Sequence, residues 1–140
     1  MSQTDFQGVI VEVSLLLNGL RVLILEDEFL IAMDVEQLCR DHGASDVSIA
    51  RDLSEIDVGQ VKAAFDVAIV DLMLNGTSTV EFAATLRDHK VPFVFASGYS
   101  DTPELLSAFP GVKLVAKPYS GEDLVEAVAS TCGRTSVPAS

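Results

Sequence analysis

The run VAIVDLMLNG, residues 67–76, places four apolar residues before a carboxylate, Asp71, and ends in an Asn-Gly turn. Short apolar runs bounded by turn residues are typical of strands that are covered on both faces of a sheet. Comparable runs lie at residues 21–25, 47–50, 91–96 and 112–116. The pattern therefore predicts a buried parallel sheet, and it raises the question of why a buried strand should end in an acid.

Segments with helical spacing of apolar residues separate these runs. The clearest lies between residues 28 and 42 and is ended by Gly43. Further helices are expected after Ser54, over residues 78–87 and over residues 122–131. Alternation of strand and helix along the chain predicts an α/β fold, with helices on both faces of the sheet.

Size, charge and cysteine content limit the class of protein. A chain of 140 residues suits one hydrophobic core, so we expect an N-terminal extension at 1–19, one domain at 20–131 and a flexible tail at 132–140. A net charge of −12 disfavours nucleic acid as a partner. Cys39 and Cys132 form no metal-binding or disulfide-scaffold spacing, which favours a cytoplasmic location.

An apolar segment at residues 8–20 precedes the first predicted strand. It lacks the basic leader of a signal peptide and is too short to cross a bilayer, so no membrane partner is expected. We interpret it as an extra strand or helix that packs on the domain. It could instead pack against a second copy of the chain, which would form a homodimer. A segment that lies on a membrane surface is the alternative hypothesis.

Polar residues follow the predicted strands at the points where they end. In doubly wound sheets the carboxyl ends of the strands meet at one edge, where ligands bind. The residues expected there are Glu26, Asp27, Asp71, Ser97 and Lys117. Crowded carboxylates need a counter-charge, and Mg²⁺ prefers carboxylate and phosphate oxygens. The set therefore suits phosphoryl chemistry, with Asp71 as nucleophile, Lys117 neutralising the phosphate and Ser97 donating a hydrogen bond to it.

Each of these residues also has a purely structural interpretation. The acids at 26–28 would favour the positive end of the helix that follows them. A single Asp after a strand is commonly a cap, Lys117 before a proline a solvated loop cation, and Ser97-Gly98 a turn. Convergence of all these residues on strand ends favours the functional interpretation.

With those residues placed, the chain resembles the receiver domain of two-component response regulators over about residues 20–131. The family's acidic pair corresponds to Glu26 and Asp27, its phosphoacceptor to Asp71, its Thr/Ser to Ser97 and its Lys-Pro step to residues 117–118. The resemblance implies a flavodoxin-like fold with strand order 2-1-3-4-5. It also implies phosphorylation of Asp71 by a histidine kinase or a histidine phosphotransfer protein, followed by output through protein contacts.

The resemblance further implies how the metal is held. Asp27, Asp71 and the backbone carbonyl of Met73 would contact Mg²⁺ directly, and Glu26 would hold it through water. The stretch at residues 91–104 is similar to the FATGUY motif of single-domain receivers, although Ser100 stands where the motif ends in Tyr.

Several positions depart from the common receiver pattern. Leu114 stands where most receivers carry a switch aromatic, and Pro103 and Pro110 leave room for only a shortened fourth helix. In the loop after the phosphoacceptor, Asn75 replaces the common Pro and Thr79 the common Gly. We expect an order-disorder response of the short helix rather than a rigid swing.

Three other functions are weighed against a stand-alone receiver. A haloacid-dehalogenase-type phosphatase would need a second Asp at the position of Met73. A flavodoxin-like flavin carrier would bind phosphate where Glu26 to Glu28 repel it. A pseudo-receiver, an interaction module that never accepts phosphate, is compatible with Leu114 and the short helix. The choice among target binding, phosphate sink and phosphorelay stays open.

Overall fold

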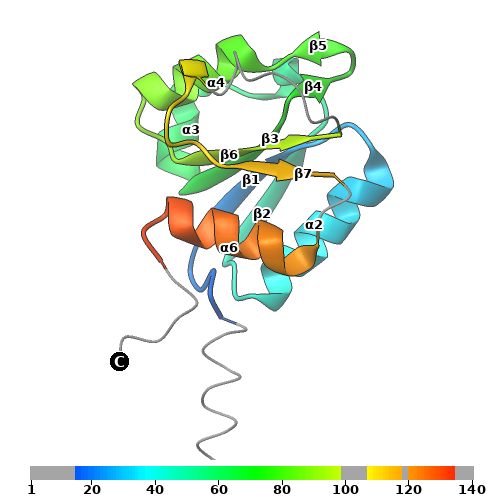
Figure 1. The fold of residues 1–140 in the computed structure, drawn as a ribbon, viewed down its shortest axis with the longest axis vertical. Coiled ribbons are helices and arrows are strands. Elements are labelled where there is room, and N and C mark those ends of the chain that lie inside the picture. The colour runs from blue at the N-terminus through cyan, green and yellow to red at the C-terminus, as the bar shows by residue number, and fades with distance from the viewer. Residues whose placement is uncertain (1–14, 99–106, 118–119, 135–140) are drawn as a thin grey trace, which may run out of the picture.

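The computed structural model describes residues 15–98, 107–117 and 120–134, in which strands and helices alternate (Figure 1). The strands are β1 (Arg21–Leu25), β2 (Asp46–Ala50), β3 (Val67–Asp71), β4 (Met73–Leu74), β5 (Thr77–Ser78), β6 (Phe93–Ser97) and β7 (Leu114–Ala116). The helices are α2 (Phe29–Asp41), the 3-10 turn η1 (Leu53–Glu55), α3 (Val58–Ala64), α4 (Val80–Asp88) and α6 (Gly121–Thr131).

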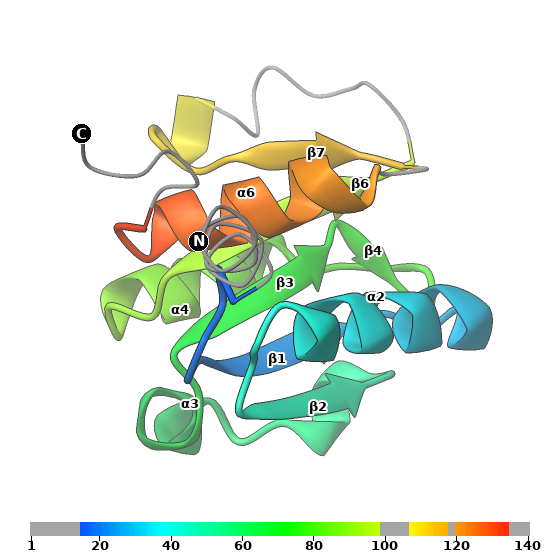
Figure 2. The same cartoon turned by 90° about the horizontal axis from the view of Figure 1, so that it is seen from below.

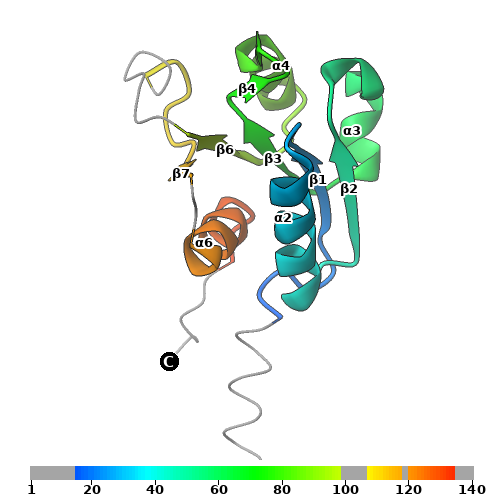
Figure 3. The same ribbon diagram turned by 90° about the vertical axis from the view of Figure 1, so that its right-hand side faces the viewer.

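The main sheet has five parallel strands in the order β2-β1-β3-β6-β7. Because β6 and β7 are the fourth and fifth of these strands along the chain, the predicted order 2-1-3-4-5 is confirmed. The helices cover both faces, with α2 and α6 on one side and α3 and α4 on the other (Figure 3). This is the doubly wound, flavodoxin-like arrangement that the sequence predicts.

Side chains of the strands contribute to two hydrophobic cores, one on each face of the sheet. In β1, Val22 and Ile24 pack in the core beneath α2 and α6, whereas Leu23 and Leu25 pack in the core beneath α3 and α4. Successive side chains of a strand point to opposite faces, so a strand covered on both sides is apolar along most of its length. All five residues of β3 and of β6 are buried for this reason.

The residues directly before β1 belong to the packed structure. Leu16 and Leu17 lie in the core beneath α2 and α6, and the amide of Leu17 donates to the carbonyl of His42 at 2.8 Å. The Arg134 guanidinium donates to the carbonyl of Asn18 at 2.7 Å, which ties the two ends of the domain together. This part of the segment at residues 8–20 therefore packs on the domain, while residues 1–14 lie outside the described part of the chain.

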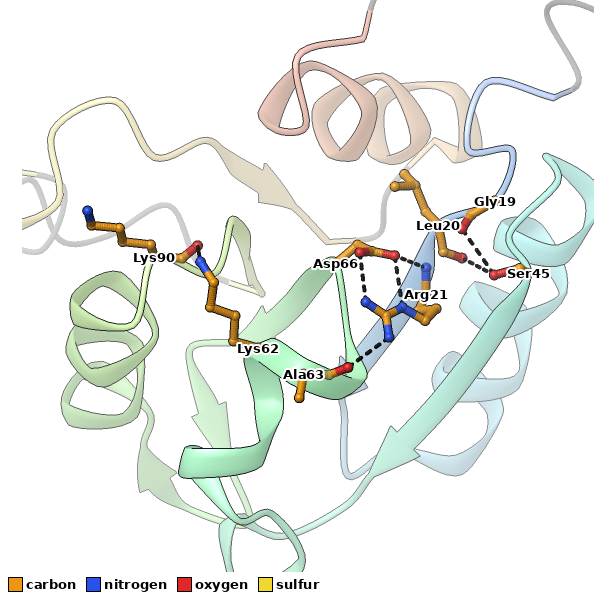
Figure 4. A network of polar contacts seen from close by, with 8 residues as sticks. All are labelled: Gly19, Leu20, Arg21, Ser45, Lys62, Ala63, Asp66 and Lys90. Atoms are coloured by element: carbon orange, nitrogen blue, oxygen red, sulfur yellow. Dashed lines mark hydrogen bonds and ion pairs between the residues drawn. The ribbon is translucent and has the colours of Figure 1, made fainter.

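The amino ends of the strands are held by an ion pair (Figure 4). The carboxylate of Asp66 accepts hydrogen bonds from the backbone amide of Arg21 at 2.8 Å and from its guanidinium at 3.0 Å. These hydrogen bonds from Arg21 lower the pKa of Asp66 below its usual range. The pair lies at the edge opposite to the one expected to carry the functional residues, so its role is to align the starts of β1 and β3.

Parts of two sequence predictions fall on undescribed residues. The first half of the segment between Pro103 and Pro110, which was expected to form the shortened fourth helix, lies outside the described residues, as does Ser100 of the FATGUY-like stretch. Phe109, the last residue of the Pro-bracketed segment, is buried against Phe93 and Phe95, with ring centroids 5.9 and 5.3 Å apart. None of the described helices has the length and apolar character to span a membrane.

The packing of Leu17 generates a stability prediction. The Leu17 side chain is fully buried, so Leu17→Ala should lower the free energy of unfolding by about 2–5 kcal/mol through the cavity that it leaves. Leu15→Ala is the matched control, because Leu15 is 41% exposed and its loss should cost less than about 0.5 kcal/mol. Urea denaturation of both variants measures the difference, and equal stabilities would show that residues 15–20 do not belong to the core.

Candidate functional site

The carboxyl ends of the parallel strands point to one edge of the sheet (Figure 2). Backbone hydrogen bonds extend the pairing one residue beyond the strands. The amide of Glu26 donates to Ala50, that of Leu72 to Ala96 and that of Lys117 to Ser97, at 3.1, 2.9 and 2.7 Å. Glu26 after β1, Asp71 at the end of β3 and Lys117 after β7 are therefore held by regular backbone structure rather than by free loops.

Lys117 lies between two carboxylates at this edge. Its ammonium group donates to Glu26 Oε1 at 2.6 Å and to Asp71 Oδ2 at 2.8 Å. The three side chains are only 12%, 2% and 10% exposed, respectively. Burial acts to lower the pKa of Lys117, but the hydrogen bonds to Asp71 and Glu26 outweigh it and raise the pKa above its ordinary value. The lysine is therefore a permanent cation of the site.

Glu26 is held at both of its carboxylate oxygens. Oε1 accepts from Lys117, and Oε2 accepts from the backbone amide of Glu28 at 3.1 Å. Burial raises the pKa of Glu26, and the Lys117 hydrogen bond opposes this effect only in part. Because both oxygens already accept hydrogen bonds, Glu26 is better suited to hold a metal ion through water than to bind it directly.

Three carboxylates form a cluster that fits a hard cation. Single oxygens of Glu26, Asp27 and Asp71 all lie within 4.8 Å of one another. Oxygen ligands of this kind suit Mg²⁺. When ionised, the three acids carry two more negative charges than Lys117 compensates, and a divalent cation would balance this excess. The acids that the sequence placed at the ends of separate strands are thus brought together.

Ser97 closes the site on the side of β6. It is the last residue of that strand, is 4% exposed and lies in register with Ala116 of β7. Its backbone carbonyl accepts the hydrogen bond from the Lys117 amide. The hydroxyl-bearing residue and the cation are therefore neighbours at the same edge, as the sequence predicted.

A small hairpin follows Asp71 and was not predicted. Residues of β4 pair with residues of β5 across an Asn75-Gly76 turn, in which both residues have positive φ, 53° and 76°. Asn-Gly is the dipeptide that favours this two-residue turn, so the signal was present in the sequence. The helix expected from Ser78 instead begins at Val80, because Ser78 is part of the hairpin.

The hairpin determines where the backbone of Met73 points. In a hairpin with a two-residue turn, Leu74 and Thr77 form the hydrogen-bonded pair, and Met73 and Ser78 the pair without mutual bonds. The amide of Met73 instead points to Asp71 Oδ1, at 3.4 Å. Since the amide and carbonyl of one strand residue point to the same side, the Met73 carbonyl is left outside the ladder.

Thr79 is a site residue that sequence reasoning missed. It is fully buried, and its hydroxyl donates to the backbone carbonyl of Asp71 at 2.7 Å. The sequence indicated only a departure from a common glycine at this position. A hydroxyl directed at a backbone carbonyl leaves no periodic or charge pattern, so no sequence signal could have identified the contact.

Comparisons with known proteins agree with this geometry. A family model for the response regulator receiver domain matches residues 22–129. No curated protein matches the chain at a significant level.

Similar solved structures include chains about twice as long as this one and chains of about the same length. The response regulator PhyR from Brucella abortus is 30% identical with a TM-score of 0.67, over 92% of this chain and 52% of that one. A mutant of the anti-anti-sigma factor PhyR from Bartonella quintana is 26% identical with a TM-score of 0.70, over 91% and 53%. The receiver domain of Francisella response regulator 1452 is 21% identical with a TM-score of 0.69, over 82% and 98%.

The present chain thus spans about half the length of the PhyR chains and nearly all of the Francisella receiver domain. The family model covers most of the chain, and the sheet order is the one that the receiver fold requires. The chain belongs to the response regulator receiver domain family.

Proposed function

We propose that this receiver domain accepts a phosphoryl group on Asp71 from a histidine kinase or a histidine phosphotransfer protein. The reaction requires Mg²⁺, takes place in the cytoplasm and leads to output through protein contacts. The observation that carries the proposal is the Lys117 ammonium group, held between the carboxylates of Glu26 and Asp71 beside a third acid, Asp27. This arrangement supplies both a nucleophile and the positive charge that an incoming phosphoryl group needs.

The transfer forms one bond and breaks one. A carboxylate oxygen of Asp71 attacks the phosphorus, while the bond from phosphorus to the donor imidazole nitrogen breaks and its electron pair leaves with the imidazole. When bound, Mg²⁺ supplies charge neutralisation for the phosphoryl oxygens. Asp27, Asp71 and the Met73 carbonyl would hold the ion directly, and Glu26 through water. Lys117 and Ser97 would donate hydrogen bonds to the phosphoryl oxygens after transfer.

Two observations favour this function over a phosphatase and over a pseudo-receiver. Met73 stands where a haloacid-dehalogenase-type phosphatase needs an acid, and its thioether side chain, 51% exposed, has no proton to give. A pseudo-receiver would not need three carboxylates beside a buried lysine, because burying such charges costs desolvation that apolar side chains of similar size would avoid. The PhyR structures, one of them described as an anti-anti-sigma factor, are consistent with an output that works by binding another protein.

Lys117 has a second role, which is to offset the cost of burying two carboxylates when neither metal nor phosphate is bound. Two buried carboxylates repel each other, and each also loses hydration. The Lys117 ammonium offsets both effects through its bonds to Glu26 and Asp71. Its removal should therefore lower the free energy of unfolding as well as impair phosphorylation.

Phosphorylation itself is tested by intact-mass measurement. Incubation with acetyl phosphate and Mg²⁺ should add one phosphoryl group to the parent protein and none to Asp71→Asn. Asp88→Asn is the matched control, because Asp88 is an acid on the exposed end of α4 and its change should leave the adduct intact. Absence of an adduct from the parent protein, with Mg²⁺ present, would support the pseudo-receiver instead.

Mg²⁺ binding is tested without phosphate. A ligand at about ten times its dissociation constant raises the free energy of unfolding by about 1.4 kcal/mol, so Mg²⁺ should raise the thermal midpoint of the parent protein. Asp27→Asn should abolish most of this increase because it removes a direct ligand. Asp34→Asn, an exposed acid of α2, should retain it. An equal increase in Asp27→Asn would show that the ion binds elsewhere.

Removal of the lysine charge tests the electrostatic account. Lys117→Met should lower the free energy of unfolding by about 3 kcal/mol near neutral pH, because it leaves two buried carboxylates without a counter-charge. The pKa of Glu26, already raised, should rise further, and an acid with a raised folded pKa destabilises less as the pH falls through that pKa. The deficit should therefore shrink from about pH 7 to about pH 5.

Two further variants complete this experiment. Glu26→Gln combined with Lys117→Met should recover part of the lost stability, because it removes one of the repelling charges. Lys113→Met changes an exposed lysine just before β7 and should alter stability by less than about 0.5 kcal/mol. A pH-independent deficit in Lys117→Met would indicate lost packing rather than unbalanced charge.

A further inference from the structure

We infer that Thr79 is a positioning residue for the phosphoacceptor: its hydroxyl fixes the backbone of Asp71 and, through the β4–β5 hairpin, the direction of the Met73 carbonyl. The inference rests on the proposed function of Asp71. Thr79 would contact neither phosphate nor metal, and would act only through the backbone of the residues proposed to bind them.

The contacts of Thr79 converge on the residues that carry the chemistry. Its Oγ1 donates to the Asp71 carbonyl at 2.7 Å and lies 3.2 Å from the Leu72 carbonyl, to which its own amide donates at 3.1 Å. Its carbonyl accepts from the amide of Ala83 in the first turn of α4, at 2.8 Å. One fully buried residue therefore joins the end of β3, the base of the hairpin and the start of α4.

The simplest structural role for this threonine does not account for its hydroxyl. Thr79 occupies the N-cap position of α4, where a Thr side chain ordinarily accepts a hydrogen bond from the helix. Here its side chain makes no such bond, and the Ser78 hydroxyl accepts from the Val80 amide instead, at 3.2 Å. The Thr79 hydroxyl is thus directed away from its own helix and towards the phosphoacceptor.

The Asp71 carbonyl needs a partner at this point of the sheet. The pairing of β3 with β1 ends at Val70 and Leu25, so the carbonyl of Asp71 lies beyond the last pair of that ladder. A buried carbonyl without a hydrogen bond is unfavourable, and the backbone would shift to find one. The Thr79 hydroxyl supplies the bond and thereby holds Asp71 in line with β3.

The hairpin transmits the same constraint to Met73. Thr79 and Leu72 form the rung at its base, and the Asn75 side chain donates to the Arg51 carbonyl at 2.6 Å near its tip. With both ends held, the backbone of Met73 has little freedom to turn. A metal ion binds more tightly when its ligands are oriented by further hydrogen bonds, so fixing the backbone of Met73 should strengthen metal binding by its carbonyl.

The test compares variants that differ in one hydroxyl. Thr79→Val keeps the shape but loses the hydroxyl, whereas Thr79→Ser keeps the hydroxyl and loses a methyl group. Thr79→Val should slow phosphorylation by acetyl phosphate about tenfold, in line with loss of one hydrogen bond to a buried group. It should also weaken Mg²⁺ binding at least about threefold, measured from the shift of the Met73 amide signal in an NMR titration. Thr79→Ser should stay within about twofold of the parent in both measurements.

A stability control separates positioning from general destabilisation. Val128→Ala opens a cavity at a fully buried position of α6, and it should lose stability but keep the parental phosphorylation rate and Mg²⁺ affinity. If Thr79→Val does not fold, Thr79→Ala removes the same hydroxyl without placing a methyl group against the carbonyl. Parental behaviour of the folded hydroxyl-free variant, or equal losses in Thr79→Ser, would overturn the inference. If the parent itself is not phosphorylated, the proposed function fails, and the Mg²⁺ titration alone still decides the role of Thr79.

Discussion

The ammonium group of Lys117 is shared by carboxylates from two other strands, and the rest of the site depends on it. Glu26 follows β1, Asp71 ends β3 and Lys117 follows β7, so one cation joins three separate crossings of the sheet at 2.6 and 2.8 Å. Without it, two acids that are almost inaccessible to water would face each other unneutralised. With it, a third acid, Asp27, can join them, and the group as a whole keeps an excess negative charge that a divalent ion would balance.

The parallel sheet supplies the precision that this charge arrangement needs. Two cores bury the strands from both faces, and backbone hydrogen bonds continue past the strand ends into the functional residues. Side chains on rigid strands can be held within hydrogen-bond distance of one another more precisely than side chains on loops. The β4–β5 hairpin extends the same principle to the loop after Asp71, where Thr79 and Asn75 replace the glycine and proline common in the family with hydrogen bonds.

Sequence patterns predicted the strands and the edge at which the polar residues meet, because strands buried on both faces have a strong apolar signal. The strand order followed instead from the resemblance to receiver domains. Glu26, Asp71, Ser97 and Lys117 were found since each stands one step after, or at the end of, such a run. The role of Thr79 was not found, because a hydroxyl bound to a backbone carbonyl depends on how a loop closes in space. Packing of the segment before β1 was expected from its apolar character, but the sequence did not show that Leu16 and Leu17 join the core on the α2 and α6 side of the sheet.

The site depends on Lys117 being a buried, charged partner of two acids. An NMR titration that follows the side-chain signals of Lys117 measures this directly, since the chain contains few lysines to assign. We expect the Lys117 ammonium to keep its proton well above the ordinary lysine pKa of about 10.4, because Asp71 and Glu26 hold it in place. Loss of the Lys117 proton at or below that value would show that burial dominates over the two carboxylates and that the lysine does not hold the acids together.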